Sequence, residues 1–519
     1  MAQAQAVPVA DPTTAQLRSQ RRLRSVTMEM EAKPGPIELI APYVAELIGT
    51  FMLVFTVGCC SIVGSAVWNA TAIAAILMVM IYAFGPVSGG HLNPAVSLAC
   101  GLAGKTPWPQ VLAYVVVQVG AGLLAGLTYW SLFDASAAVG PKGGFGWFHA
   151  GVVEVAYTAM LCFVVLNCAT SIRNNPAQDQ NHFFALAIGF VVVAGGYAAG
   201  DISGACFNPA VSLGLDVTGT ASPAQGSGVH WRFAYVGYQA LGSALAAALF
   251  LACRGREVGL DSESLREGCG DDAEPGESSR VLSEFLGTFM LVFTVGLNLV
   301  MKSPATPWSA AAALMCMIYS LGDVSGGHFN PAVTLGVVLS GRGACPPARG
   351  AAYALAQTAA GMLAGPLYAD FHYWGPHRDE PFGLRPGRSL QGPGAASGWW
   401  GVFAAEAAFT FMLAFVVLAV ATAAPSSAST KQSFQFALAI GSCVTAGGFA
   451  IGAISGGSLN PAVSWGIATA NKVHTGDASV SHWPSCLWFS LFELCGGLVA
   501  AAVFATTHVY EYQKAGHSQ

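Results

Sequence analysis

The tripeptide Asn-Pro-Ala occurs four times, and its residue types predict a definite local structure. At average composition, such a tripeptide is expected about 0.1 times in a chain of this length. Asparagine is favoured as the N-cap of a helix and proline at the first helical position, so each copy predicts a helix start. The four copies comprise Asn93, Pro94, Ala95, Asn208, Pro209, Ala210, Asn330, Pro331, Ala332, Asn460, Pro461 and Ala462.

The helices predicted to follow these tripeptides are short. The apolar segment after each proline runs for only about 8–10 residues, which is about 15 Å of helix or half of a bilayer. Free backbone groups at the bilayer midplane survive only beside a cavity or packed protein. Two half-helices that enter from opposite faces would therefore meet N-terminus to N-terminus, next to a cavity.

This meeting point predicts a selective opening. Each helix start carries a partial positive charge, and Asn93 with Asn208, or Asn330 with Asn460, can aim amide N–H groups at a passing molecule. A water that accepts from both amides turns its own hydrogens outward, which interrupts the relay needed for proton hopping. Cations meet an electrostatic barrier, whereas neutral hydrogen-bonding solutes pass.

The composition requires a membrane around these segments. Hydrophobic residues make up 54% of the 519 residues, charged residues only 9%, and the mean hydropathy is +0.54. Much of the charge lies in 1–35 and 254–280. The remaining long apolar stretches exclude a soluble enzyme. The net charge of −5 gives no indication of nucleic-acid binding. No C-x-x-C pair occurs among the 13 cysteines, so no metal site or cofactor is expected.

Internal repeats define the architecture. GTFMLVFTVG occurs at 49–58 and again at 287–296, which indicates a duplicated unit of about 240 residues. Each unit contains two halves, and each half has three apolar stretches long enough to span a membrane. Because three is odd, the second half must run in the opposite direction. We expect an all-α membrane protein of two fused units, each with six transmembrane helices and two half-helices in an inverted repeat.

The predicted organisation has five parts. They are an N-terminal tail (1–40), a first unit (41–253), a charged linker (254–280), a second unit (281–508) and a C-terminal tail (509–519). In the first unit, basic residues gather on the side of the N-terminus, which predicts that both tails and the linker are cytoplasmic. The sequence does not distinguish the plasma membrane from an internal, vacuolar-type membrane.

These motifs resemble the major intrinsic protein (aquaporin) family over nearly all of 42–253 and 281–507. The resemblance rests on AELIGTFMLVF at 45–55, SGGHLNPAV at 88–96 and SGACFNPAV at 203–211. It implies a tandem, two-unit member of the family. It also implies that one glutamate in each half braces the half-helix loops through backbone hydrogen bonds. The matching residues are Glu46, Glu154, Glu284 and Glu406.

The resemblance further implies a narrow selectivity filter of four positions in each unit. The matching residues are Ile73, Gly196, Ala205 and Val211 in the first unit and Ala310, Gly448, Gly457 and Val463 in the second. Orthodox members place arginine where Val211 and Val463 stand, and water-selective members place histidine where Gly196 and Gly448 stand. We therefore expect wider, more apolar openings that admit glycerol, urea or ammonia as well as water. His91 and His328 match a family histidine that lines the pore.

The function expected from these features is passive conduction through one pore in each unit. The chain is not expected to be an enzyme, and its partners would be water, small neutral solutes and the lipid bilayer. Family members resembling this chain assemble as four units, which implies a homodimer with four pores. The alternative is a proton- or ion-coupled secondary transporter, which also uses inverted repeats and broken helices.

Overall fold

A computed structural model shows how these segments are arranged. It describes residues 35–135, 137–175, 180–215, 230–255, 274–380, 382–387, 396–423, 435–475 and 483–515. Most of the predicted N-terminal tail and linker, and the last four residues, lie outside this set. The boundaries predicted for the two tails and the linker therefore stay predictions.

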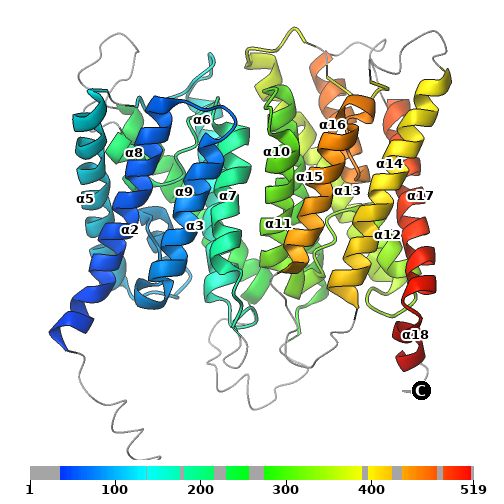
Figure 1. The fold of residues 1–519 in the computed structure, drawn as a ribbon, viewed down its shortest axis with the longest axis horizontal. Helices are drawn as coiled ribbons and strands as arrows, with labels where there is room; N and C mark the ends of the chain where they lie inside the picture. The colour runs from blue at the N-terminus through cyan, green and yellow to red at the C-terminus, as the bar shows by residue number, and fades with distance from the viewer. Residues whose placement is uncertain are drawn as a thin grey trace, which may run out of the picture.

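The described residues form helices that group into two similar units, which lie side by side in Figure 1. The long helices of the first unit are α2 (Pro36–Val63), α3 (Asn69–Ser88), α5 (Trp108–Phe133), α6 (Trp147–Val165), α7 (Phe184–Ala199) and α9 (His230–Arg254). Those of the second unit are α10 (Glu277–Val300), α11 (Thr306–Ser325), α13 (Pro347–Trp374), α14 (Ala396–Val417), α15 (Gln435–Ser455) and α17 (Trp483–Thr507). This arrangement confirms the predicted fold class. A terminal helix, α18 (Val509–Ala515), follows α17.

A short helix follows each Asn-Pro-Ala copy, as predicted. These half-helices are α4 (Pro94–Leu102), α8 (Pro209–Leu215), α12 (Pro331–Leu339) and α16 (Pro461–Thr475). In α4 and α12 the asparagine is the N-cap, and its side chain accepts a hydrogen bond from the backbone N–H two residues later. With 15 residues, α16 exceeds the expected 8–10, because good helix formers such as Ala468, Ala470 and Lys472 continue it.

Most long helices suit a bilayer. Within the described ranges, nine helices are long and apolar enough to cross a membrane, and α7 is a shorter apolar helix of 16 residues. The alanine-rich α11 is not among the nine, and its residues from Ser309 to Leu321 are all buried. It contacts α7, α10 and α15, so protein rather than lipid surrounds it.

The two units pack through α6 and α7 of the first and α10 and α11 of the second. Tyr157 Oη lies 2.9 Å from Thr294 Oγ1, and Ser309 Oγ donates to Ala194 O over 2.8 Å. Near the end of α9, Arg254 holds Asp323 of α11 through two hydrogen bonds of 2.6 and 2.8 Å. The two halves of the chain therefore form one packed body.

Figure 1 places the beginning of α2 and the end of α17 on the same side of the helix bundle, the lower side in this view. This is the outcome expected when each unit crosses the membrane an even number of times.

Candidate pores at the half-helix tips

The tips of α4 and α8 are joined by their asparagine side chains. Asn93 Nδ2 donates to Phe207 O over 3.0 Å, and Asn208 Nδ2 donates to Leu92 O over 3.0 Å. Each asparagine thus bonds the residue that precedes the other one. An amide nitrogen has two N–H groups, so one from each side chain remains for a molecule in the adjoining cavity.

The second unit repeats this contact between α12 and α16. Asn330 Nδ2 donates to Leu459 O over 2.8 Å, and Asn460 Nδ2 donates to Phe329 O over 2.9 Å. Two independent tip-to-tip contacts therefore exist in one chain, as the paired asparagines predict.

A buried glutamate holds the loop before α4. The Glu46 carboxylate accepts from Ser88 Oγ over 2.7 Å and from the backbone N–H groups of His91 and Leu92 over 2.9 and 2.6 Å. Gln118 Nε2 of α5 donates to it over 2.8 Å. A carboxylate within a membrane protein is costly unless donors surround it, and these four bonds supply them.

Two further loops have the same brace. Both carboxylates are fully buried, and each accepts from one serine hydroxyl, two backbone N–H groups and one glutamine amide. The donors to Glu154 are Ser203, Cys206, Phe207 and Gln239, and those to Glu284 are Ser325, His328, Phe329 and Gln357.

The fourth brace differs from the other three. Glu406 accepts from Ser455 Oγ, Leu459 N and Ser458 N. At the place of the glutamine stands a second carboxyl, Glu493 of α17, which is also fully buried. Its Oε1 accepts from Ser458 Oγ over 2.6 Å.

The braces hold a strained backbone. The residue before each asparagine has a left-handed φ: +49° at Leu92, +50° at Phe207, +47° at Phe329 and +53° at Leu459. Side chains other than glycine rarely adopt this conformation, which costs about 1–3 kcal/mol. In all four loops the N–H of this residue donates to the glutamate, so the brace keeps the asparagine at the tip.

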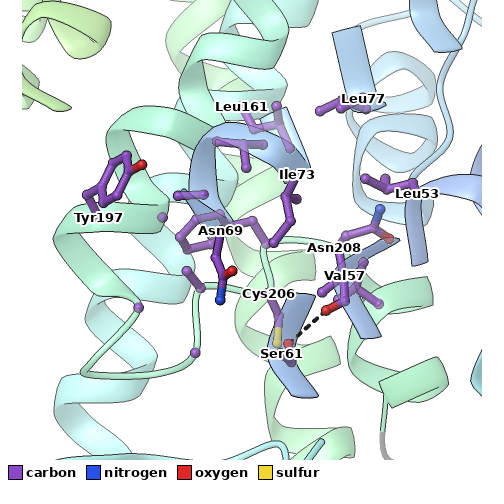
Figure 2. Close-up of a pocket in the computed structure, with 18 of the residues that line it drawn as sticks. Leu53, Val57, Ser61, Asn69, Ile73, Leu77, Leu161, Tyr197, Cys206 and Asn208 are labelled. Carbon is purple, nitrogen blue, oxygen red and sulfur yellow. Dashed lines mark hydrogen bonds between the residues drawn. The ribbon is translucent and has the colours of Figure 1, made fainter. Parts of the chain in front are cut away.

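A cavity of about 270 Å³ lies beside the tips of α4 and α8. Its lining includes all four residues expected to form the first filter, together with His91, Asn93 and Asn208. Figure 2 shows Ile73, Cys206 and Asn208 around this space.

A smaller cavity of about 120 Å³ lies beside the tips of α12 and α16. It is lined by Ala310, Gly448, Gly457 and Val463, the residues expected to form the second filter, together with His328, Asn330 and Asn460. The structure thus brings each set of residues expected to form a filter to one cavity with its asparagine pair.

Gly196 of α7 and Gly448 of α15 do not simply add empty space to the cavities. A Cβ on Gly196 would lie 2.7 Å from Ala70 Cβ, and one on Gly448 would lie 2.6 Å from Pro307 Cβ. These glycines therefore let neighbouring helices approach closely. Any extra width must come mainly from Val211 and Val463, which are shorter than arginine.

The two cavities also differ in residues that the sequence patterns did not single out. Lys142 and Asp201 line the first cavity, whereas Gly383 and Leu384 line the second. Loop residues such as Lys142 belong to no repeated motif. The brace glutamines and Glu493 do carry a signal, because they are polar residues within apolar spans.

The two histidines expected to line the pores lie next to hydroxyl groups. His91 Nδ1 lies 3.0 Å from Ser97 Oγ, and His328 Nδ1 lies 3.1 Å from Thr334 Oγ1. Both residues are buried and line their cavities, so each ring can present its other nitrogen to the cavity.

Comparison with known proteins agrees with this geometry. The family model described as Major intrinsic protein matches residues 36–250, 152–300 and 273–504. The chain is 34% identical over 197 residues to probable aquaporin NIP4-2 of Arabidopsis thaliana, which covers 35% of this chain and 66% of that protein. It is 35% identical to aquaporin NIP1-4 of Oryza sativa, covering 36% of this chain and 70% of that protein.

The first of these alignments spans slightly less than two thirds of the relative. Among solved structures, the aquaglyceroporin from Plasmodium falciparum is 20% identical with a TM-score of 0.37, over 45% of this chain and 97% of that one. The two longer family-model matches, 36–250 and 273–504, cover the two units in turn. The chain therefore belongs to the major intrinsic protein family, as a multi-pass integral membrane protein with two aquaporin-like units in tandem.

Proposed function

We propose that the protein is a passive channel for water and small uncharged solutes, with one pore in each unit. The observation that carries this proposal is the reciprocal bonding of paired asparagines at half-helix tips, each pair beside a cavity. Two helix N-termini face a molecule at this point and oppose cations. The related proteins are named as aquaporins, which supports the same function.

The braces argue against the alternative of a coupled transporter. Such a protein needs a carrier carboxylate that is reached from each side in turn. Glu46, Glu154 and Glu284 are fully buried, and each accepts from four donors, which belong to the loop that it braces and to a neighbouring helix. Their place is therefore that of structural supports.

The cavities favour different solute ranges for the two pores. The first is about 270 Å³ and has Lys142 and Asp201 in its lining, while the second is about 120 Å³. We expect the first pore to conduct glycerol and urea better than the second. We also propose that both tails and the linker are cytoplasmic, on the basis of the basic residues in the first unit.

Osmotic swelling of proteoliposomes in a stopped-flow instrument tests this function. Ile73→Trp should block the first pore and Ala310→Trp the second, because each side chain lines its cavity. Each single variant should retain part of the water permeability, and the double variant should fall to the rate of empty vesicles. Undiminished permeability in a correctly inserted double variant would refute conduction through these cavities.

We further propose that two chains assemble into a four-pore homodimer. Within one chain, 78% of the most apolar stretch of α6 and 61% of that of α10 are buried, against 22% for α3 and 33% for α15. In the repeat, α14 and α15 correspond to α6 and α7, while α2 and α3 correspond to α10 and α11. In the proposed dimer, α14 and α15 of one copy therefore pack on α2 and α3 of the other. Ala72, which corresponds in the repeat to the buried Ser309, is exposed.

The assembly is tested by measuring the mass of the solubilised protein with native mass spectrometry. The unsubstituted chain should be dimeric, and Ala72→Trp should give monomers. Leu112→Trp, at an exposed site on α5, is the matched control and should stay dimeric. A monomeric unsubstituted chain in several mild detergents would contradict the proposal.

A further inference from the structure

The second pore contains a buried pair of carboxyl groups that the first pore lacks. Gln239 of the first unit donates to Glu154 over 3.0 Å and to Ser212 over 2.8 Å. Glu493 takes this place in the second unit, since Ser464, the counterpart of Ser212, donates to it over 2.9 Å. The neutral partner of one brace has thus become an acid.

The two acids lie close together. Ser458 Oγ is 2.6 Å from Glu493 Oε1 and 3.4 Å from Glu406 Oε2, so these two carboxylate oxygens are at most 6.0 Å apart. Both side chains are fully buried. Two like charges this close in a medium of low dielectric cannot both persist without a compensating cation, and one of them takes up a proton.

The hydrogen bonds indicate which oxygen holds the proton. Glu493 Oε1 accepts from Ser458 Oγ, Ser464 Oγ and Asn460 N. Its other oxygen, Oε2, is buried and has no hydrogen-bond partner among the described residues. An oxygen that receives no donor is the natural place for the hydroxyl of a neutral carboxyl group. Glu406, with two backbone donors and Ser455, is better placed to carry the negative charge.

Among the described residues, no positive charge lies on the helices next to Glu493 where it could balance two carboxylates. Of the elements packed on α17, α14 provides Glu406, while α12 and the π-helical segment η6 (Leu418–Thr422) contain no charged residue. Lys472 of α16 is eight residues beyond Ser464, and Glu511 of α18 is 18 residues beyond Glu493. On α17 itself, the other titratable side chains are the thiols of Cys486 and Cys495.

The pair is connected directly to the pore. Ser458 and Asn460 line the second cavity, and both donate to Glu493 Oε1, over 2.6 and 3.1 Å. Glu493 therefore acts as a positioning residue for the asparagine at the tip of α16. In the first unit the corresponding loop is held by a neutral amide instead.

We propose that the pair of Glu406 and Glu493 holds one proton, carried by Glu493, and that this proton sets the position of Ser458 and Asn460. Conduction through the second pore then depends on pH, whereas the first pore lacks this response. This inference rests on the proposed channel function. Loss of the proton places two negative charges behind the loop. Their repulsion displaces Asn460, and permeability of the second pore falls.

The test compares the two pores of the full chain separately. Water permeability is measured between about pH 6 and pH 9 in proteoliposomes that carry Ile73→Trp, which leaves the second pore, or Ala310→Trp, which leaves the first. We expect a decrease of about three-fold or more on alkalinisation for the second pore only. His91 lines the first cavity and His328 the second. An effect of histidine protonation would therefore appear in both variants.

A reciprocal exchange assigns the response to the carboxyl pair. With Ile73→Trp, Glu493→Gln should give a flat pH profile, because it restores the side chain found in the other three braces. With Ala310→Trp, Gln239→Glu should give the first pore the pH response. A profile that is equally steep with and without Glu493→Gln, or a flat profile in the unsubstituted second pore, would overturn the proposal.

Infrared difference spectroscopy gives a readout that does not depend on conduction. The unsubstituted protein, switched between acid and alkaline buffer, should show a protonated carboxyl C=O stretch that Glu493→Gln removes. Absence of this band would show that Glu493 carries no proton and would overturn the proposal. By contrast, solute accumulation driven by an imposed pH gradient would refute the passive channel itself, so the two failures are distinguishable.

Discussion

At the scale of single residues, we propose that Val211 and Val463 act as filter residues that limit what each pore admits. Val211 and Val463 line the two cavities beside the asparagine pairs. A valine supplies neither the positive charge nor the forked N–H donors of arginine. If these positions form the filters, the guanidinium that arginine would supply is missing from both, and the polar groups left beside each valine include the asparagine pair and one histidine.

Replacing both valines by arginine should narrow the pores. In Val211→Arg plus Val463→Arg, we expect glycerol and urea permeability to fall about ten-fold and water permeability to fall less, because the guanidinium occupies space and adds charge. Stopped-flow swelling under gradients of each solute measures this. The single variants serve as controls for each pore. Unchanged glycerol and urea rates in the double variant would refute the filter assignment.

The backbone at Ala205 offers a second test at this scale. Ala205 has φ +54°, and the corresponding residues of the other three loops are Gly90, Gly327 and Gly457, with φ of +63°, +64° and +66°. Glycine adopts this conformation without a Cβ penalty. Ala205→Gly should therefore stabilise the protein by about 1 kcal/mol, seen as a higher unfolding temperature in detergent.

The reverse substitution checks the same argument. Gly90→Ala should lower the unfolding temperature, because its Cβ would lie 3.4 Å from Ile81 Cα at an unfavourable φ. Equal unfolding temperatures for both variants and the unsubstituted protein would show that the loop backbone relaxes freely.

At the scale of elements, the half-helices are fixed by close contact with spanning helices. The carbonyl oxygen of Ala210, at the start of α8, lies where a Cβ on Gly122 of α5 would be 2.4 Å away. In the second unit, Ala462 and Gly361 repeat this contact at 2.2 Å. Glycine is required here because the backbones of two helices touch.

Alanine at this contact should displace the half-helix. Gly122→Ala is expected to destabilise the protein by about 1–3 kcal/mol through overpacking and to reduce permeability of the first pore. Gly120→Ala is the matched control on the same helix, since nothing lies within 4 Å of its Cβ, and it should be neutral or stabilising by up to about 1 kcal/mol. Equal effects of the two variants on unfolding and permeability would contradict the contact.

The repeats and the Asn-Pro-Ala motifs predicted the spanning helices and the half-helices from the sequence, because helix starts and the lengths of apolar segments are local properties. The packing of Gly196 against Ala70 and the acid pair around Glu493 were not predicted. Both depend on which side chains of distant helices meet, and no local pattern encodes that meeting. The length of α16 was also missed, since the Asn-Pro-Ala pattern marks a helix start and not its end.

At the scale of the whole molecule, the two units are joined by polar contacts as well as apolar packing. Arg254 and Asp323 form a bidentate pair whose side chains are 1% and 7% exposed. Arg254 Nε also donates to Asn167 Oδ1 over 2.5 Å, and its NH2 group donates to Ser320 O over 2.8 Å. A single arginine at the end of α9 thus contacts the residues just after α6 and those of α11, across the junction of the units.

Breaking this pair should loosen the junction. Asp323→Asn leaves a buried guanidinium without its charged partner, and we expect a loss of about 3–5 kcal/mol, measured by thermal unfolding of the solubilised protein. Replacing both partners, in Arg254→Met plus Asp323→Leu, should recover part of this loss, because neither charge of the pair is then buried alone. The recovery is incomplete because Asn167 and Ser320 lose a donor and Arg173 loses its ion pair with Asp323. The exposed pair of Arg349 and Glu277, whose Glu277 side chain is 63% exposed, provides the control: Arg349→Ala should cost at most about 1 kcal/mol. If Asp323→Asn unfolds like Arg349→Ala, the buried ion pair does not hold the junction, and the other contacts between the units do.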